Sequence, residues 1–173
     1  MKKYLVIGNP INHSLSPELH NYWIKQNKIS AVYEKRLIDI QDIESILADL
    51  KNDKISGINV TVPFKKAIIP FLDKLSSTAK ETASVNTIYK RNNQLCGDNT
   101  DIDGFRYSLE RLKFNVKGKK ALVIGAGGVA PSIISALNIM GATQINLINR
   151  TKKKAEDLKK QFPFLEIFNW GET

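Results

Sequence analysis

The sequence contains one cysteine and two histidines among its 173 residues. With Cys96 alone, no disulfide can form within the chain and no cysteine cluster can hold a metal ion. No apolar run reaches the ~18 residues that a membrane-spanning helix needs. The N-terminal stretch is too short for a signal-peptide core and lacks a small-residue cleavage site. These absences predict a cytoplasmic globular protein that contains no metal.

Acidic residues are also few, since 26 lysines and arginines stand against 17 aspartates and glutamates, giving a formal charge of +9. Nucleic-acid binding is one interpretation of such a charge. The basic residues are spread along the chain, however, and the densest stretch, residues 150–160, also contains Glu156 and Asp157, as a solvated helix face would. No aromatic and basic motif supports nucleic-acid recognition. We therefore expect neither nucleic acid nor membrane as a partner, and a phosphorylated small ligand explains part of the charge equally well.

Residues 1–101 alternate between predicted strands and helices. A serine, a proline and an acid at Ser16, Pro17 and Glu18 predict a helix whose N-cap is Ser16. Strands are expected at 3–8, 31–38, 56–62, 85–90 and 94–97, and helices over 43–50 and 64–72. The pattern predicts an α/β domain whose sheet is covered on both faces.

Residues 102–173 predict a second α/β unit. Strands at 121–124, 144–148 and 165–168 alternate with helices at 131–140 and 152–161, after a first helix at 105–112. This order is typical of half of a doubly wound, Rossmann-type nucleotide-binding sheet. The chain ends inside that unit, so we expect it to be an incomplete nucleotide-binding domain with an unpaired edge and with exposed apolar side chains such as Leu147 and Ile167.

A glycine-rich turn joins the first strand and helix of this second unit. Its residues, Gly125, Ala126, Gly127, Gly128, Val129 and Ala130, fit the pattern G-x-G-x-x-A in the strand-to-helix context that the motif requires. Such a turn lets the backbone approach a pyrophosphate, which the N-terminus of the helix stabilises. A glycine-rich turn without a ligand is the alternative.

The end of the next strand bears on the choice of dinucleotide. An NAD site usually has Asp or Glu there, bonded to the ribose 2′-hydroxyl, whereas this chain has Asn149, Arg150 and Thr151. A guanidinium pairs well with a 2′-phosphate, and Lys154 adds a second cation. The sequence therefore predicts NADP, although Arg150 could also be an ordinary exposed charge at a strand end.

Four polar motifs fall at predicted strand ends, where open α/β sheets bind ligands. They are NHSLSP at 12–17, NVTVPFK at 59–65, SVNT at 84–87 and GDNTD at 97–101. The hydroxyls of Ser14 and Ser16 beside a helix N-terminus suit a carboxylate, and Asn59 and Thr61 share one face of a strand. Each motif taken singly also has a purely structural explanation, such as helix capping, an exposed lysine or turn formation.

In their order and spacing, these motifs, the glycine turn and Asn149-Arg150-Thr151 resemble the shikimate dehydrogenase family over essentially the whole chain. The resemblance implies an NADP-dependent enzyme that interconverts 3-dehydroshikimate and shikimate in aromatic amino-acid biosynthesis. Members of the family continue beyond the point where this chain ends, so the resemblance also implies truncation at the C-terminus.

The resemblance also assigns residues. Ser14 and Ser16 would hold the shikimate carboxylate, while Asn59, Thr61 and Asn86 would contact the ring hydroxyls or support the site. Lys65 and Asp101 would be the catalytic pair. The glycine turn with Asn149, Arg150, Thr151 and Lys154 would bind NADP.

Other functions stay open at this point. A quinate/shikimate dehydrogenase of broader specificity that uses NAD is the nearest enzyme, and Arg150 argues against it. A non-catalytic binding fragment on the same scaffold is another alternative, against which the presence of both Lys65 and Asp101 argues. The sequence does not decide the oligomeric state, and a homodimer is among the options.

Overall fold

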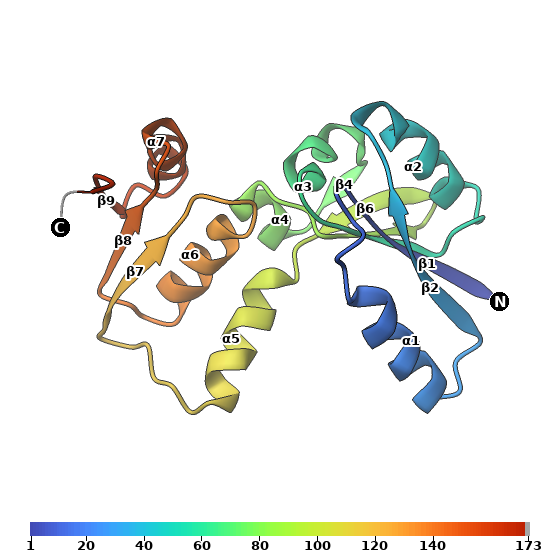
Figure 1. Cartoon of the computed structure of the whole chain (residues 1–173), viewed down its shortest axis with the longest axis horizontal. Coiled ribbons are helices and arrows are strands. Elements are labelled where there is room, and N and C mark those ends of the chain that lie inside the picture. The colour runs from blue at the N-terminus through green and yellow to red at the C-terminus, as the bar shows by residue number, and fades with distance from the viewer. Residues whose placement is uncertain (172–173) are drawn as a thin grey trace. The chain divides into compact units, whose positions relative to one another are not determined.

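The structure is a computed structural model that describes residues 1–171 (Figure 1). Contacts between Cα atoms divide the chain into two compact units, Met1–Asn99 and Thr100–Thr173. Each unit has a hydrophobic core of its own. The α/β class that the sequence predicts is confirmed for both units.

The first unit is built on a six-stranded sheet. Its strands are β1 (Lys2–Gly8), β2 (Ala31–Leu37), β3 (Gly57–Val60), β4 (Lys74–Leu75), β5 (Thr87–Arg91) and β6 (Gln94–Asp98), in the spatial order β2-β1-β3-β5-β6-β4. β1 is parallel to β2 and β3, whereas β5 runs antiparallel to β3 and β6. The carboxyl ends of β1, β3 and β6 and the amino end of β5 consequently lie along one edge of the sheet.

Helices lie on both faces of this sheet, as predicted. They are α1 (Ser16–Gln26), α2 (Ile43–Lys51), α3 (Phe64–Ala67) and α4 (Ser77–Thr82), with 3-10 turns at Ile40–Asp42 and Ile69–Phe71. Because side chains alternate along a strand, Leu5 and Ile7 of β1 join the larger core, while Val6 packs with Ile11 and Tyr33 on the other face. Figure 1 shows α1 on the face opposite α2 and α3.

The second unit contains a parallel sheet of three strands in the order β7-β8-β9. Its elements are α5 (Asp101–Arg111), β7 (Lys120–Ile124), α6 (Ala130–Ile139), β8 (Gln144–Ile148), α7 (Lys152–Gln161) and β9 (Glu166–Phe168). Strand and helix alternate as in half of a Rossmann-type sheet. The sequence prediction of this partial fold is confirmed.

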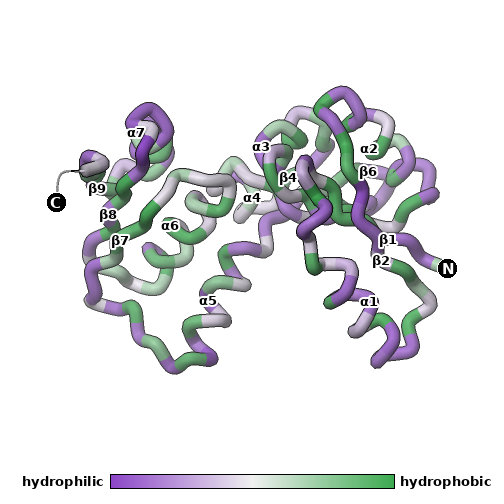
Figure 2. Tube along the Cα trace, in the orientation of Figure 1, coloured by the Kyte–Doolittle hydropathy of each residue, from purple (hydrophilic) through white to green (hydrophobic). Residues whose placement is uncertain are grey.

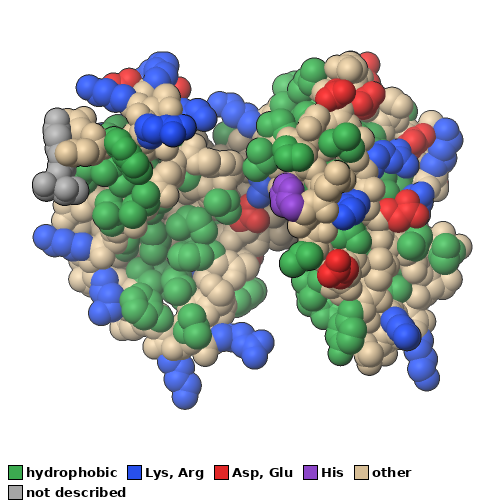
Figure 3. Space-filling view, viewed as in Figure 1, with side chains coloured by type: hydrophobic (Ala, Val, Ile, Leu, Met, Phe, Trp, Pro, Cys, Tyr) green, Lys and Arg blue, Asp and Glu red, His purple; other side chains and the backbone are tan. Residues whose placement is uncertain are grey.

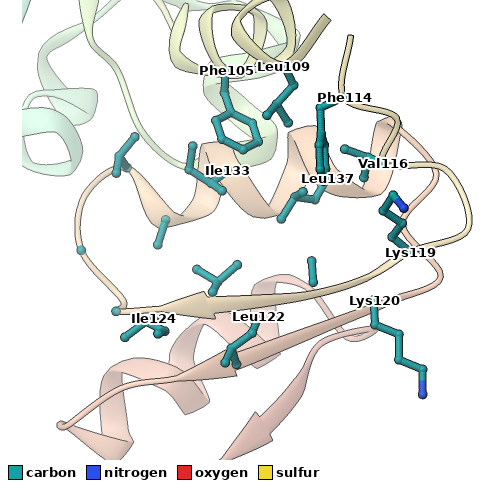
Figure 4. A pocket seen from close by; sticks show the side chains of 16 residues that line it. Phe105, Leu109, Phe114, Val116, Lys119, Lys120, Leu122, Ile124, Ile133 and Leu137 are labelled. Carbon is teal, nitrogen blue, oxygen red and sulfur yellow. The ribbon is translucent and has the colours of Figure 1, made fainter. Parts of the chain in front are cut away.

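One face of β7 is apolar and open to solvent. Leu122 is 57% and Ile124 70% exposed, and the strand contributes to a cavity of about 730 Å³ that also takes in Phe105 and Ile133 from the neighbouring helices (Figure 4). β7 is hydrophobic along the trace, and hydrophobic side chains gather on this part of the second unit (Figures 2 and 3). The expectation of exposed Leu147 and Ile167 was wrong: Leu147 is fully buried and Ile167 partly so, because β8 is the central strand and helices pack against it.

Two local features also differ from the sequence-based expectation. The N-cap of α1 is Leu15 rather than Ser16, and the N-cap residue itself makes no side-chain hydrogen bond to the helix. The two-residue strand β4 follows a 3-10 turn and pairs with β6, which no local pattern had indicated. A strand this short has no readable period, so only the tertiary pairing defines it.

Candidate functional site

The loops that follow β1 and β3 are joined by backbone hydrogen bonds. The Asn9 N–H donates to the Val62 carbonyl over 3.0 Å, and the Thr61 N–H donates to the Ile7 carbonyl over 3.0 Å. A Cβ atom on Gly8 would stand only 2.6 Å from the Thr61 side chain. Glycine at position 8 therefore lets Thr61 come close to the end of β1.

Ser14 and Ser16 lie together at the start of α1. The Ser14 hydroxyl oxygen accepts a hydrogen bond from the Ser16 backbone N–H over 3.3 Å, and both residues are partly exposed. The structure thus brings these two hydroxyls to one helix N-terminus, where backbone donors also face an incoming anion. Neighbouring Asn12 is held through its carbonyl, which accepts from Lys35 Nζ over 2.7 Å.

Backbone hydrogen bonds tie the segment of Lys65 to the segment of Asn86. The Lys65 carbonyl accepts from the Val85 N–H over 2.8 Å, and the Asn86 carbonyl accepts from the Val60 N–H over 2.8 Å. The Asn86 side chain is nearly buried, at 9% exposure, and Lys65 is half-buried. Two of the polar motifs thus lie side by side at the edge where β3 ends and β5 begins.

Asn59 makes contacts that the sequence did not indicate. Its Oδ1 accepts from the Tyr33 hydroxyl over 2.7 Å, and its Nδ2 donates to Thr87 Oγ1 over 3.1 Å and to the Asn86 carbonyl over 3.2 Å. Tyr33 was missed because a tyrosine in a strand is usually read as core. The usable signal is chemical, since a buried phenol needs a hydrogen-bond partner.

The GDNTD motif has structural roles at its first polar positions. Asp98 accepts hydrogen bonds from Ser76 and Thr78 at the start of α4, and the buried Asn99 donates to the Ser84 carbonyl over 2.9 Å. Asp98 and Asn99 therefore fasten α4 and the segment that leads to Asn86. Asp101, the predicted catalytic residue of this motif, is the first residue of α5 and belongs to the second unit.

The glycine turn of the second unit is a tight and open turn of the backbone. Gly125 has a φ of +106°, and a Cβ atom placed on Gly125 or Gly127 would meet no described atom within 4 Å. Asn149 Oδ1 accepts from the Ala126 N–H over 3.0 Å, so the turn is tied to the end of β8. The turn is open for a ligand to approach the backbone, directly before α6.

Beside this turn, the residues after β8 border a small cavity. It has a volume of about 210 Å³, and its lining includes Asn149, Arg150 and Lys152 together with Phe168 and Trp170. Asn149 Nδ2 donates to the Thr151 carbonyl over 2.8 Å, which fixes the loop. Arg150, Thr151 and Lys154 are exposed. Lys152, which the sequence reasoning did not single out, supplies a second cation to the cavity lining.

Two classes of site are not found among residues 1–171. No helix there has the length and apolar character to cross a membrane. Nor do three or more His, Cys, Asp or Glu side chains in this range gather into a set that could hold a metal ion.

Comparison with known proteins gives the same result for both units. Residues 6–88 match the family described as the shikimate dehydrogenase substrate binding domain, and residues 108–168 match the shikimate / quinate 5-dehydrogenase family. The shikimate dehydrogenase (NADP(+)) of Pelagibacter ubique is 60% identical over 172 residues, which are 99% of this chain and 65% of that protein.

Two solved structures are similar over nearly the whole chain. The shikimate dehydrogenase of Aquifex aeolicus superposes with a TM-score of 0.92 at 45% identity, covering 99% of this chain and 64% of that one. Shikimate 5-dehydrogenase of Listeria monocytogenes, solved in complex with shikimate and NAD, gives 0.90 at 28% identity, covering 98% and 61%. The chain thus spans somewhat less than two thirds of the length of these relatives. Its two matched segments, and its identity with these relatives, show that the chain belongs to the shikimate dehydrogenase family.

Proposed function

We propose that this chain carries the substrate site and part of the cofactor site of an NADP-dependent shikimate dehydrogenase, which reversibly reduces 3-dehydroshikimate to shikimate. The proposal rests on the arrangement of polar residues at one edge of the first sheet. There the loops and strand ends that bear Ser14, Thr61, Lys65 and Asn86 come together, in a chain that belongs to this family. We further propose that residues 1–101 are the substrate-binding domain and residues 102–173 the nucleotide-binding one.

In the proposed complex, Ser14 and Ser16 bind the carboxylate of shikimate. Two hydroxyls at one helix N-terminus suit an anion, because hydroxyl and backbone donors converge there. Thr61 and Asn86 bind the ring hydroxyls. Asn59 supports Asn86 by donating a hydrogen bond to the Asn86 backbone carbonyl. This division of roles matches the polarity of a small, hydroxylated carboxylic acid.

Lys65 and Asp101 are the proposed catalytic pair. Reduction of the ketone needs a proton at the carbonyl oxygen, and the ammonium of Lys65 can donate it and take it back in the reverse direction. Asp101 would orient that ammonium and bond the hydroxyl.

The residues of the second unit fit a dinucleotide phosphate. Gly125 and Gly127 leave the backbone open, and Arg150 and Lys152 border the adjoining cavity with positive charge. We propose that the turn Gly125–Ala130 holds the pyrophosphate and that Asn149, Arg150, Thr151 and Lys154 hold the 2′-phosphate of NADP. When bound, the cofactor supplies the hydride, and the protein supplies orientation and the proton.

An NAD-dependent enzyme that also accepts quinate is the second candidate. The NAD in the Listeria monocytogenes complex favours it, whereas Arg150 favours NADP because a guanidinium pairs with a 2′-phosphate. A direct comparison of NADP with NAD, and of shikimate with quinate, decides between the two. A cytoplasmic location and a homodimeric assembly are parts of the proposal that rest on the family alone.

The substrate site is tested by titrating the 173-residue chain with shikimate in a calorimeter. We expect saturable heat, and we expect the Ser14→Ala/Ser16→Ala variant to lose it, because the carboxylate then has no hydroxyl donors. Ser30→Ala, an exposed serine just before β2, is the matched control and should bind as the unmodified chain does.

The outcomes separate the parts of the proposal. Absence of heat at millimolar shikimate, for a chain whose far-ultraviolet spectrum shows a folded α/β protein, would contradict a substrate site within these 173 residues. Binding that survives in Ser14→Ala/Ser16→Ala would move the carboxylate site elsewhere. NADPH-dependent reduction of 3-dehydroshikimate by the same chain then tests turnover separately from binding.

A further inference from the structure

A continuous chain of hydrogen bonds runs across the first sheet to Asn86. The Tyr33 hydroxyl donates to Asn59 Oδ1 over 2.7 Å, and Asn59 Nδ2 donates to Thr87 Oγ1 over 3.1 Å. The Thr87 hydroxyl in turn donates to Asn86 Oδ1 over 2.9 Å. Tyr33 lies on β2, Asn59 on β3 and Thr87 on β5, so the chain crosses the sheet on the α1 face, where Tyr33 packs with Val6.

The direction of these hydrogen bonds is set by a backbone carbonyl. The Asn86 carbonyl can only accept, and it lies 3.2 Å from Asn59 Nδ2. The Asn59 amide must therefore place its nitrogen toward Asn86 and its oxygen toward Tyr33, which has to donate. Thr87 then accepts from Asn59 and has its own proton for Asn86 Oδ1. A reversed Asn86 amide would instead donate to Thr87 Oγ1, and the Thr87 proton would then lose its acceptor in this chain.

Tyr33 is held firmly at the start of the chain. It is 4% exposed, and its ring stacks on His20 with centroids 4.2 Å apart and an angle of 4° between the ring planes. The Asn21 side chain bonds both the backbone N–H and the carbonyl of Tyr33, over 2.9 and 2.7 Å. Burial raises the pKa of Tyr33 to about 12, so its hydroxyl keeps the proton that it donates throughout the neutral range.

We propose that Tyr33 is a positioning residue of the substrate site. It acts through Asn59 and Thr87 and fixes the side-chain amide of Asn86. Because Asn86 Oδ1 is engaged by Thr87, the NH₂ group on the other branch of the same carbon is turned away from Thr87. The hydrogen bond from Thr87 thus sets which way the Asn86 amide faces. This inference rests on the proposed function, in which Asn86 contacts a ring hydroxyl of shikimate.

The test removes the Tyr33 hydroxyl and keeps its ring. In Tyr33→Phe the 173-residue chain should bind shikimate on the order of 10-fold more weakly, as expected for one lost hydrogen bond next to a buried acceptor. Without ligand, the ¹⁵N-labelled side-chain amide of Asn86 should shift, its resonances being identified by their loss in Asn86→Ala. Tyr89→Phe makes the same chemical change on β5, at a residue that is 37% exposed, and should change neither quantity.

A double-mutant cycle separates positioning from a general structural effect. If Tyr33 acts through Asn86, then Tyr33→Phe should weaken shikimate binding no further in an Asn86→Ala background. Equal losses in both backgrounds would overturn the proposal, as would wild-type affinity in Tyr33→Phe.

A second pair of variants covers the case in which Tyr33→Phe does not fold. Thr87→Val interrupts the chain at its last link and should weaken binding as Tyr33→Phe does, whereas Thr87→Ser keeps the hydroxyl and should restore affinity. Equal affinity in Thr87→Val and Thr87→Ser would contradict the proposal.

Failure of the proposed function gives a different result. If the unmodified chain does not bind shikimate, the substrate assignment is wrong, and the amide resonances decide the positioning role by themselves. An unchanged Asn86 amide in Tyr33→Phe then overturns that role, and a shifted one supports it.

Discussion

The hydroxyl of Ser76 donates a hydrogen bond to the carboxylate of Asp98 over 2.6 Å. The same hydroxyl oxygen accepts from the Ala79 N–H and so caps α4. Asp98 also accepts from the Thr78 hydroxyl over 3.0 Å and from the Asn99 N–H over 2.7 Å. A single carboxylate at the end of β6 thus fixes the start of α4 and the turn that leads into α5.

Replacing this carboxylate should destabilise the first unit. Asp98→Asn keeps the shape but replaces the charged acceptor of three hydrogen bonds with a neutral amide, so we expect the free energy of unfolding to fall by about 1–2 kcal/mol. Chemical denaturation measures the loss. Asp53→Asn is the control, because Asp53 pairs with Lys90 at a side-chain exposure of 76%, and exposed ion pairs contribute little. Equal stability of Asp98→Asn and the unmodified chain would show that α4 is held by packing alone.

Asp98 should also make stability depend on pH. Burial by itself raises the pKa of Asp98, but hydrogen bonds from Ser76, the Asn99 backbone and Thr78 outweigh it, so the pKa lies below its ordinary value. The stabilisation is then complete above the unfolded pKa of about 3.9 and is lost as the pH falls through the lower folded value. The difference in unfolding free energy between the unmodified chain and Asp98→Asn should therefore narrow progressively as the pH falls below about 3.9. A difference that does not narrow at any pH below this value would refute the assignment.

Asp98 also marks the limit of what the sequence could predict. The GDNTD motif was interpreted as a site motif or as turn chemistry, and the structure finds fastening roles for Asp98 and Asn99. Ser76 and Thr78 lie about twenty residues earlier, and no local pattern links them to Asp98. Periodicity did predict α2, whose buried Ile43, Ile46, Leu47 and Leu50 follow the expected spacing, because that spacing is a property of one helix.

Exposure in the second sheet was harder to predict, for a similar reason. β7 and β8 are both strongly apolar in sequence, yet Leu147 is fully buried and Leu122 is 57% exposed. Strand order and sheet face together decide this difference. β8 lies between two strands, while β7 pairs with β8 alone within residues 1–171. Leu122 lies opposite Asn146 and Leu147 opposite Val123, so the two leucines point to different faces of the sheet. The residue types of a strand do not reveal where that strand lies in the sheet.

The same contrast predicts two very different effects of one substitution. Leu147→Ala should cost about 2–5 kcal/mol in unfolding free energy, because it opens a cavity in a packed core. Leu122→Ala, on the adjoining strand, should cost far less, since its side chain already meets solvent. Thermal and denaturant unfolding of both variants checks this. Similar losses of unfolding free energy in the two would mean that the cavity along β7 is closed in solution.

Arg150 should discriminate between the two dinucleotides. Arg150→Ala removes a charge that can pair with the 2′-phosphate, so we expect NADP(H) binding to weaken on the order of 10-fold or more, with NAD(H) binding little changed. Fluorescence titration with both cofactors measures the ratio. Lys153→Ala is the control, because Lys153 is exposed and pairs with Asp157 on its own helix. Equal losses for both cofactors would place Arg150 against a part of the cofactor that they share.

Lys65 and Lys66 allow the proposed proton transfer to be tested on neighbouring lysines. Lys65 is half-buried, at the end of the NVTVPFK motif, while Lys66 is exposed. Turnover of 3-dehydroshikimate should fall by ~10²–10⁴-fold in Lys65→Ala, with shikimate affinity nearly unchanged, because the ammonium acts on the reacting oxygen rather than on the bound carboxylate. Lys66→Ala should keep both. The proposal thus expects a loss of rate without a loss of affinity. The opposite result, a Lys65→Ala chain that binds shikimate poorly but turns over normally when saturated, would make Lys65 a binding residue. The proton would then have to come from another group.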